Sequence, residues 1–162
     1  MGTPQIRAVR REEYDAVGDL TADIYRSEGY GSPEYEPALR DVASRDASAY
    51  VIVAVLDARV VGAVTVSTHG GPWAERAQPG EAEIRMLVVD PAARGIGTGE
   101  ALVRGCVDRA RADGCTAVRL STEPQMAAAH RLYERLGFVR DPQHDWSPVP
   151  GVTLLGYRLD LS

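Results

Sequence analysis

The chain has 162 residues, 44% of them hydrophobic and 25% charged, which is the composition of a soluble globular protein large enough to bury a core. Its formal net charge of -5 argues against general nucleic-acid binding, and no apolar run approaches the length of a membrane span. The two cysteines, Cys106 and Cys115, have neither disulfide nor zinc spacing. We therefore expect one domain over residues 1–162, cytoplasmic, with reduced thiols and no metal.

The N-terminal part of the chain predicts a strand followed by two helices. Residues 5–10 alternate between apolar and polar side chains, which is typical of a strand with one buried face. Apolar residues recur at helical spacing over 12–25, so we expect a first helix that ends near Gly29. A glycine–proline loop follows, and 34–43 predicts a second helix.

A hairpin and a long connection come next. Two β-branched runs, 50–56 and 60–67, flank a short turn and predict two antiparallel strands. The connection over 69–80 contains several glycines and prolines together with Trp73. Because binding residues often lie on loops of a rigid scaffold, Trp73 is a candidate for gating a substrate. The alternative is a surface aromatic residue with no role in binding.

The stretch 81–89 predicts the central strand, which Asp90 and Pro91 end. Period-two alternation puts one set of residues on a core face: Ala82, Ile84, Met86 and Val88. The other face holds Glu81, Glu83, Arg85, Leu87 and Val89. Since this second face begins polar and ends apolar, we expect it to start in a solvated cleft and to become buried near the following loop.

A glycine-rich loop and a strong helical pattern over 100–112 follow the central strand. The loop reads Arg94, Gly95, Ile96, Gly97, Thr98 and Gly99. Glycines let a backbone approach a ligand, and a helix N-terminus offers free N–H groups, so this junction suits a phosphate or pyrophosphate. A P-loop is excluded because the chain has no lysine, and the glycine spacing disfavours a Rossmann-type nucleotide binder. A plain helix start is the remaining alternative.

The C-terminal part predicts a strand over 117–121, parallel to the central strand because a helix connects the two. A helix over 126–136, a short strand over 138–140 and a final strand over 152–161 complete the chain. The link between the last two strands carries Trp146, and we expect this loop to lie on the substrate side.

Two motifs together resemble those of the GCN5-related N-acetyltransferase (GNAT) family. Arg94, Gly97 and Gly99 match Arg-x-x-Gly-x-Gly, the acyl-CoA-binding motif of that family. The second motif is similar to A-x-x-L-Y-x-x-L-G-F and extends from Ala129 to Phe138. The resemblance implies an α/β (α+β) fold with a mixed, mostly antiparallel sheet of six or seven strands and about four helices. Its order is strand, helix, helix, three strands, helix, strand, helix and two strands, with a parallel, splayed fourth and fifth strand.

The resemblance also implies a function, namely transfer of an acetyl group from acetyl-CoA to a primary amine. In such a family, backbone amides of the loop hold the CoA pyrophosphate, and Tyr133 donates a proton to the departing thiolate. A glutamate on the central strand accepts the proton of the amine through water, and Glu83 occupies that position. Backbone amides near Leu87, Val88 and Val89 stabilise the oxyanion. Glu81 is the reserve base and a low-priority substrate contact. A homodimer is also implied.

Several alternatives stay open at this point. Tyr133 and His130 are both candidate cofactor contacts, although the tyrosine could pack only against the CoA arm and the histidine could lie on the surface. Glu83 could instead form a cross-strand pair with an arginine. A tyrosine wall at the acceptor site would include Tyr30, together with Tyr25 and Tyr35, or these rings could merely pack. The second functional hypothesis is a silent acyl-CoA-binding sensor, because Met126 stands where the family commonly has an asparagine.

Overall fold

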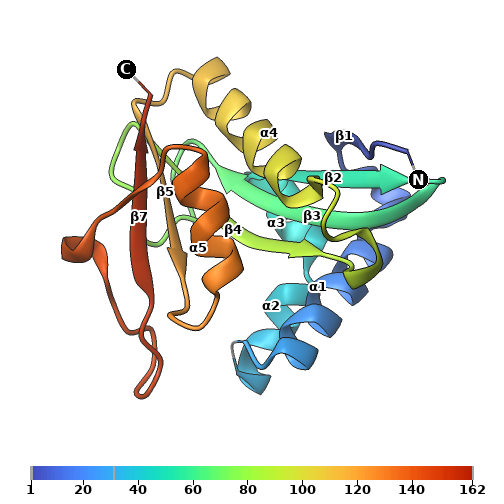
Figure 1. Cartoon of the computed structure of the whole chain (residues 1–162), viewed down its shortest axis with the longest axis horizontal. Coiled ribbons are helices and arrows are strands. Elements are labelled where there is room, and N and C mark those ends of the chain that lie inside the picture. The colour runs from blue at the N-terminus through green and yellow to red at the C-terminus, as the bar shows by residue number, and fades with distance from the viewer. Residues whose placement is uncertain (1, 31, 162) are drawn as a thin grey trace.

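The computed structural model describes residues 2–30 and 32–161, and one seven-stranded sheet runs through them (Figure 1). The strand order is β1-β2-β3-β4-β5-β7-β6, and every neighbouring pair is antiparallel except β4 and β5. The expected mixed sheet is therefore confirmed, and the mostly parallel sheet of a Rossmann-type binder is excluded. Gly31, in the loop expected after the first helix, lies outside the described residues. The strands are β1 (Gln5–Ala8), β2 (Tyr50–Leu56), β3 (Arg59–Ser67), β4 (Glu81–Val89), β5 (Ala117–Thr122), β6 (Val139–Arg140) and β7 (Leu155–Asp160).

Helices cover both faces of this sheet (Figure 1). On one face, Leu102 of the long central helix joins Ile52 in the larger core cluster. On the other face, Val17 of the first helix joins Val53 in a second cluster. No helix among the described residues is long and apolar enough to cross a membrane. The helices are α1 (Tyr14–Glu28), α2 (Glu36–Arg40), α3 (Val42–Ser48), α4 (Thr98–Ala112) and α5 (Ala127–Arg135).

Turn residues account for two predicted boundaries. Helix α1 ends at Gly29, whose φ of 74° is the left-handed conformation that glycine adopts without strain. Strands β2 and β3 are joined by Asp57 and Ala58, which have φ of 52° and 61°. Positive φ at both central residues is the geometry of a tight two-residue hairpin, so the predicted hairpin is confirmed.

The helix expected over 34–43 is broken into α2 and α3 at Asp41, which is a correction to the prediction. The Asp41 carboxylate accepts a hydrogen bond from an amide in the first turn of α3 and so begins a new helix. Arg45, only 1% exposed, donates to the carbonyl oxygens of Ala38 and Leu39 at the end of α2. Because a helix end leaves carbonyls without partners, this buried guanidinium stabilises the break. The chain therefore has five described α-helices where about four were expected.

Strand β4 reverses its alternation at Met86, which has a left-handed φ of 57°. The pairing with β3 shifts register at this point, so the extra residue forms a β-bulge. Ala82 and Ile84 pack in the core under α4, whereas Met86 and Val88 pack on the side of α1. The prediction that these four residues share one face is wrong, because a bulge moves every later side chain to the opposite face.

The parallel pairing of β4 with β5 extends only to Ile84, which lies opposite Leu120. Beyond this point the two strands no longer pair, and Figure 1 shows β4 and β5 diverging. The edge of β4 over residues 85–89 is thereby released from the sheet on the β5 side. The splayed parallel pair that the family resemblance implies is confirmed, and it opens a gap in the middle of the sheet.

Candidate active site

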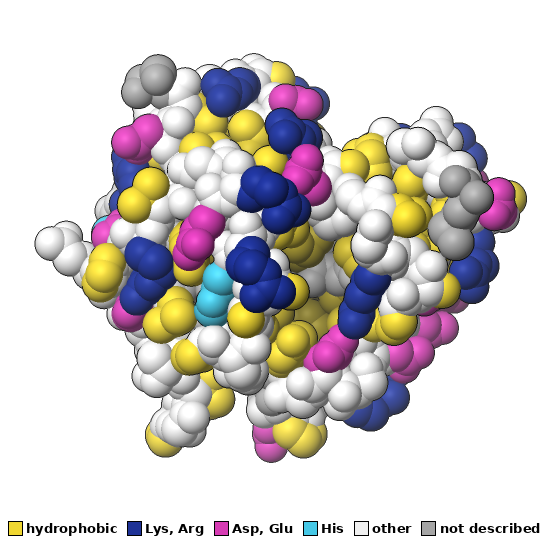
Figure 2. Space-filling model, in the orientation of Figure 1, with side chains coloured by type: hydrophobic (Ala, Val, Ile, Leu, Met, Phe, Trp, Pro, Cys, Tyr) yellow, Lys and Arg dark blue, Asp and Glu magenta, His cyan; other side chains and the backbone are white. Residues whose placement is uncertain are grey.

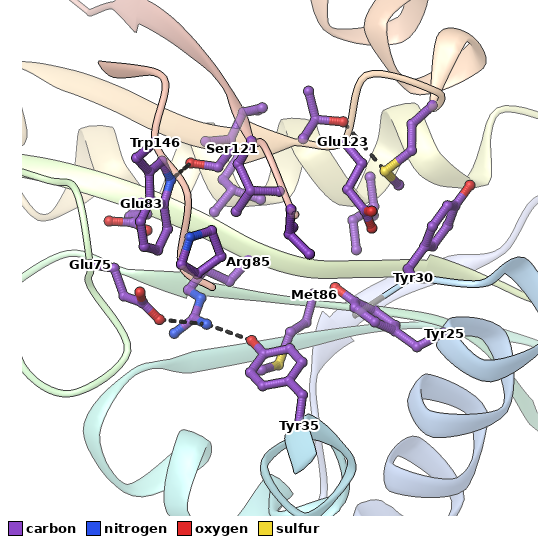
Figure 3. A pocket seen from close by; sticks show the side chains of 18 of the residues that line it. Tyr25, Tyr30, Tyr35, Glu75, Glu83, Arg85, Met86, Ser121, Glu123 and Trp146 are labelled. Atoms are coloured by element: carbon purple, nitrogen blue, oxygen red, sulfur yellow. Dashed lines mark hydrogen bonds and ion pairs between the residues drawn. The ribbon is translucent and has the colours of Figure 1, made fainter. Parts of the chain in front are cut away.

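A cleft of about 220 Å³ lies where β4 and β5 separate. Figure 2 shows a hollow between the two sides of the molecule, with hydrophobic side chains on its floor. Residues from the end of α1, from β4 and β5, from α5 and from the loop before β7 line the cleft (Figure 3). Seven candidate site residues named from the sequence are among them: Tyr25, Tyr30, Tyr35, Glu83, Leu87, Tyr133 and Trp146. Their contacts with substrates stay predictions.

Glu83 is held at the bottom of the cleft by the loop between β3 and β4. The side chain is buried, and its Oε1 accepts hydrogen bonds from the backbone amides of Arg76 at 2.7 Å and Ala77 at 2.9 Å. Its Oε2 makes no hydrogen bond with any described residue. The alternative of an ion pair with an arginine is therefore wrong. A carboxylate fixed through one oxygen presents the other at a defined position, which suits a base or an amine-binding group.

Tyr133 lines the cleft from α5 and is buried. Its ring packs against Phe138 and Tyr157, with ring centroids 5.9 Å and 6.0 Å away. Burial raises the pKa of its hydroxyl well above the ordinary value, so the proton is present at neutral pH. Its hydroxyl makes no hydrogen bond with any described residue. Because buried polar groups normally have partners, this hydroxyl is available for a bound ligand.

Arg85 occupies the middle of the cleft, two residues after Glu83 on the same strand (Figure 3). Its Nη2 donates to the hydroxyl of Tyr35 and pairs with the Glu75 carboxylate at 3.0 Å. No role was assigned to Arg85 or Glu75 from the sequence. The period-two pattern placed Arg85 on the same face of the strand as Glu83, which could have marked it as a site residue. No neighbouring residue in the sequence indicated its contacts with Tyr35 and Glu75.

Aromatic rings form one wall of the cleft. Tyr25 lies 6.1 Å from Tyr30 and 6.2 Å from Tyr35 between ring centroids, and all three line the cleft. Trp146 forms part of the opposite side, where its indole N–H donates to the Ser121 hydroxyl at 3.0 Å. Trp146 also pairs with Leu154 in an isolated antiparallel bridge, which lies just outside β7. Strand β7 itself begins at Leu155, three residues later than the expected residue 152.

The loop before α4 has the features of an anion site. Gly95 and Gly97 have φ of 80° and 84°, and no side chain caps the helix at Gly97. The backbone amides from Gly95 to Glu100 make no hydrogen bond with any described residue. Such a row of free N–H groups at a helix N-terminus fits a phosphate or pyrophosphate. Ile96 is exposed beside them.

The side chains of this loop stabilise its shape. The Arg94 guanidinium donates from Nε to the carbonyl of Val89 at 3.1 Å and pairs through Nη2 with Glu28 at 2.8 Å. The Thr98 hydroxyl is buried and donates to the carbonyl of Ala93 at 3.0 Å. A ligand at this loop would therefore contact the backbone N–H of Thr98. The side chain of Thr98 would not reach the ligand.

Glu81 does not line the cleft, which corrects its selection as a reserve base and substrate contact. Its buried carboxylate pairs with Arg119 at 2.6 Å and with Arg158. The polar face expected to begin in solvent is thus buried at this end of β4. Burial alone would raise the pKa of Glu81, but hydrogen bonds from Arg119, Arg158 and the Gln78 amide outweigh it, and the pKa lies below its ordinary value.

The Glu81 contacts predict a loss of stability in acid. A carboxylate with a lowered pKa stabilises the folded state above the ordinary glutamate pKa of about 4.3, and this contribution is lost as the pH falls toward the folded-state value. We expect the unfolding free energy of Glu81→Gln to fall less steeply below about pH 4 than that of the wild type. Urea unfolding at several pH values measures this. Parallel curves for the two proteins would contradict it.

Trp73 and His130 also lie away from the lining of the cleft. Trp73 packs under the guanidinium groups of Arg45 and Arg85, each 5.8 Å from the ring centroid, so it supports the cleft and does not gate it. The His130 Nε2 lies 3.0 Å from the carbonyl oxygen of Glu123, which occupies that nitrogen. His130 does not line the cleft, and its contact with a cofactor stays a prediction.

The buried thiols take no part in the cleft. Cys106 and Cys115 are free and buried, as expected, and neither lines the cleft. Burial raises the pKa of both thiols, which keeps them protonated and unreactive. Among residues 2–30 and 32–161, no group of three or more histidine, cysteine, aspartate or glutamate side chains could hold a metal ion.

Comparison with known proteins identifies a matching family and related sequences. The family model described as Acetyltransferase (GNAT) family matches residues 14–138. N-acetylaspartate synthetase of Rattus norvegicus is 37% identical over 102 residues, which is 63% of this chain and 32% of that protein. Mycothiol acetyltransferase of Cellulomonas flavigena is 35% identical over 113 residues, which is 64% of this chain and 32% of that protein. The chain thus matches about a third of each relative.

Solved structures share the fold over nearly the whole chain. A GNAT-family acetyltransferase from Staphylococcus aureus Mu50 has a TM-score of 0.79 at 15% identity and covers 98% of this chain and 99% of its own. The structure of yncA from Salmonella typhimurium, solved with its cofactor acetyl-CoA, has a TM-score of 0.75 at 22% identity. It covers 99% of this chain and 95% of its own. At these identities the likeness concerns the fold.

Proposed function

The chain belongs to the acetyltransferase (GNAT) family, and from this premise we propose that it transfers an acetyl group directly from acetyl-CoA to a primary amine of a small molecule or protein. The observation that supports this most is the cleft at the splayed strands, which Glu83 and Tyr133 both line. The Glu83 carboxylate can accept a proton, and the Tyr133 hydroxyl can donate one. The proposal also includes a cytoplasmic location, which rests on the composition of the chain, and a homodimer, which rests on the family resemblance.

The free amides of the glycine loop would bind the pyrophosphate of acetyl-CoA, and the gap between β4 and β5 would admit its thioester arm. When bound, acetyl-CoA supplies an activated acetyl group. An alkylammonium has a pKa of roughly 10, so the acceptor must lose a proton before its nitrogen attacks. Oε2 of Glu83 would take that proton through a water molecule. Amides at residues 87–89 would donate to the thioester oxygen as negative charge develops on it.

Tyr133 would complete the transfer by protonating the sulfur. A bond forms between the neutral amine nitrogen and the acetyl carbon, and the nitrogen then releases its second proton to water. The carbon–sulfur bond breaks, and the thiolate takes the phenolic proton. The raised pKa of Tyr133 is compatible with this role. Burial would raise the pKa of the departing thiol in the same direction, because both groups ionise to an anion. Solvent then returns the proton to Tyr133.

The enzyme and sensor hypotheses differ in one measurable property. We expect thiol release from acetyl-CoA to depend on an amine, measured across a panel that includes amino acids, aliphatic amines, polyamines and a peptide N-terminus. Mass spectrometry should find the acetylated amine. The sensor hypothesis, motivated by Met126, predicts CoA binding by calorimetry without turnover of any amine. The proposed function is wrong if that second result is obtained.

Substitution of Gly97 tests the loop as the CoA site. We expect Gly97→Val to weaken CoA binding at least tenfold, or about 1.4 kcal/mol, because a β-branched side chain would stand where the backbone must approach phosphate. Calorimetry of the folded variant measures this.

Gly114→Val is the matched control for Gly97→Val. Gly114 has a similar φ of 78°, equally open surroundings, and a position just beyond the other end of α4. The two variants therefore carry comparable backbone strain. We expect Gly114→Val to bind CoA like the wild type. Unchanged CoA affinity in Gly97→Val, or an equal loss in both variants, would contradict the assignment of the loop.

A further inference from the structure

The cleft carries a pair of opposite charges on one strand. Glu83 and Arg85 are two residues apart on β4, before the bulge, and both line the cleft (Figure 3). Two residues of a strand span roughly 6.6 Å, and residues at this spacing point to the same face. An α-amino acid has an ammonium and a carboxylate on one carbon. Its ammonium could donate a hydrogen bond to Glu83 and its carboxylate could accept one from Arg85, and the two bonds would bridge that spacing.

Arg85 retains hydrogen-bonding capacity toward the cleft. Both of its contacts, to Tyr35 and to Glu75, use Nη2, so Nε and Nη1 make no hydrogen bond with any described residue. Its side chain is 15% exposed and that of Glu75 is 39% exposed. No other arginine or histidine among the described residues lines the cleft, and the chain has no lysine. A guanidinium held at one nitrogen and open at the others is suited to a carboxylate.

We propose that the acceptor is an α-amino acid with an uncharged side chain, whose carboxylate binds Arg85 while its amine lies beside Glu83. This rests on the proposed acetyl transfer and assigns Arg85 as the residue that determines acceptor class. Binding of the acceptor carboxylate at Arg85 also directs the acceptor amine toward the carboxylate of Glu83, because Glu83 is the neighbouring side chain on the same face of β4.

The rest of the cleft determines which amino acids fit. Its walls are mainly apolar, with Tyr25, Tyr30, Met86 and Val149 among the lining residues. Glu75 and Glu123 also line it, and a second acidic group on the acceptor would meet their repulsion in a partly dry site. Apolar side chains such as that of leucine are therefore favoured over that of aspartate.

The first experiment compares L-leucine with isoamylamine and L-leucinamide, two matched amines that lack the carboxylate. With acetyl-CoA as donor, we expect kcat/KM for leucine to exceed that for either amine at least tenfold, as for the loss of a charge-assisted hydrogen bond. L-Aspartate should be at least tenfold poorer than leucine. Equal turnover of leucine and isoamylamine would overturn the proposal and leave the acetyltransferase function standing.

The second experiment assigns the selectivity to Arg85. In Arg85→Gln, the ratio of kcat/KM for leucine to that for isoamylamine should fall at least tenfold, and Arg85→Lys should restore part of it. A structural role would lower both rates and leave the ratio unchanged, which would contradict the proposal. Arg104→Gln removes the same charge from the exposed face of α4 and should keep the wild-type ratio.

A third measurement separates acceptor binding from catalysis. With CoA present and no acetyl donor, leucine should raise the thermal unfolding midpoint of the wild type but not of Arg85→Gln, and isoamylamine should raise neither. If leucine stabilises the protein in this way but no amine is ever acetylated, the proposed function is wrong and Arg85 is still a carboxylate site. If leucine stabilises both proteins equally, the assignment of Arg85 is wrong.

Discussion

Tyr133→Phe is expected to lower kcat by about a hundredfold or more, the usual contribution of a general acid. The substitution keeps the ring packed against Phe138 and Tyr157 and removes only the hydroxyl, which has no partner among the described residues. CoA affinity should therefore change by less than about 1 kcal/mol, the range for one neutral hydrogen bond. The loss in kcat should shrink with an acyl donor whose thiol is more acidic, because a better leaving group needs less protonation.

Tyr157→Phe is the matched control for this prediction. It removes a hydroxyl from the same aromatic cluster, but that hydroxyl donates to Glu134 and Tyr157 does not line the cleft. We expect its kcat to equal that of the wild type. A large loss of CoA affinity in Tyr133→Phe with kcat spared would make Tyr133 a binding residue. No effect on either quantity would mean that the thiolate leaves without its help.

Glu83→Gln is expected to lower kcat/KM by about a hundredfold at neutral pH. The glutamine amide nearly preserves the shape of the side chain but cannot take a proton from the amine. Activity should recover partly as the pH approaches the amine pKa of roughly 10, because solvent then supplies the neutral amine. The pH dependence of kcat/KM for both proteins, measured with one amine, tests this.

A second carboxylate in the same cleft provides the control. Glu123→Gln removes an equal charge from another residue that lines the cleft, so we expect it to keep the wild-type shape of the pH profile. If Glu83→Gln also keeps that shape, the proton acceptor lies elsewhere. Solvent would then be the next candidate, since Glu81 is bound by Arg119 and Arg158 outside the cleft.

Local patterns in the sequence predicted most of the fold. The strand over 81–89 and the helix after the glycine loop have nearly the expected bounds, because period-two and helical patterns report burial on one face. The break at Asp41 was not predicted, since it depends on Arg45 reaching back to the carbonyls of α2. The bulge at Met86 was also missed, because a methionine in left-handed conformation leaves no local signal.

The candidate site was predictable where the family motifs cover it. Tyr133 and the glycine loop are motif positions, Glu83 was assigned from the family's glutamate on the central strand, and the cleft and the free amides were found at these residues. Arg85 was missed because its contacts come from distant parts of the chain, with Tyr35 fifty residues before it. Trp73 was predicted to gate a substrate because it is an aromatic residue in a polar loop. The sequence does not show that its ring packs against the guanidinium groups of Arg45 and Arg85.

The measurement that tests the account most directly is the intact mass of the protein after incubation with acetyl-CoA alone, followed by addition of leucine. Direct transfer predicts an unchanged protein mass and no thiol release before the amine is added, because no cysteine lines the cleft. Thiol and acetylated amine should then appear in equal amounts. An acetylated protein that forms without the amine and passes its acetyl group on when leucine is added would contradict direct transfer through the cleft.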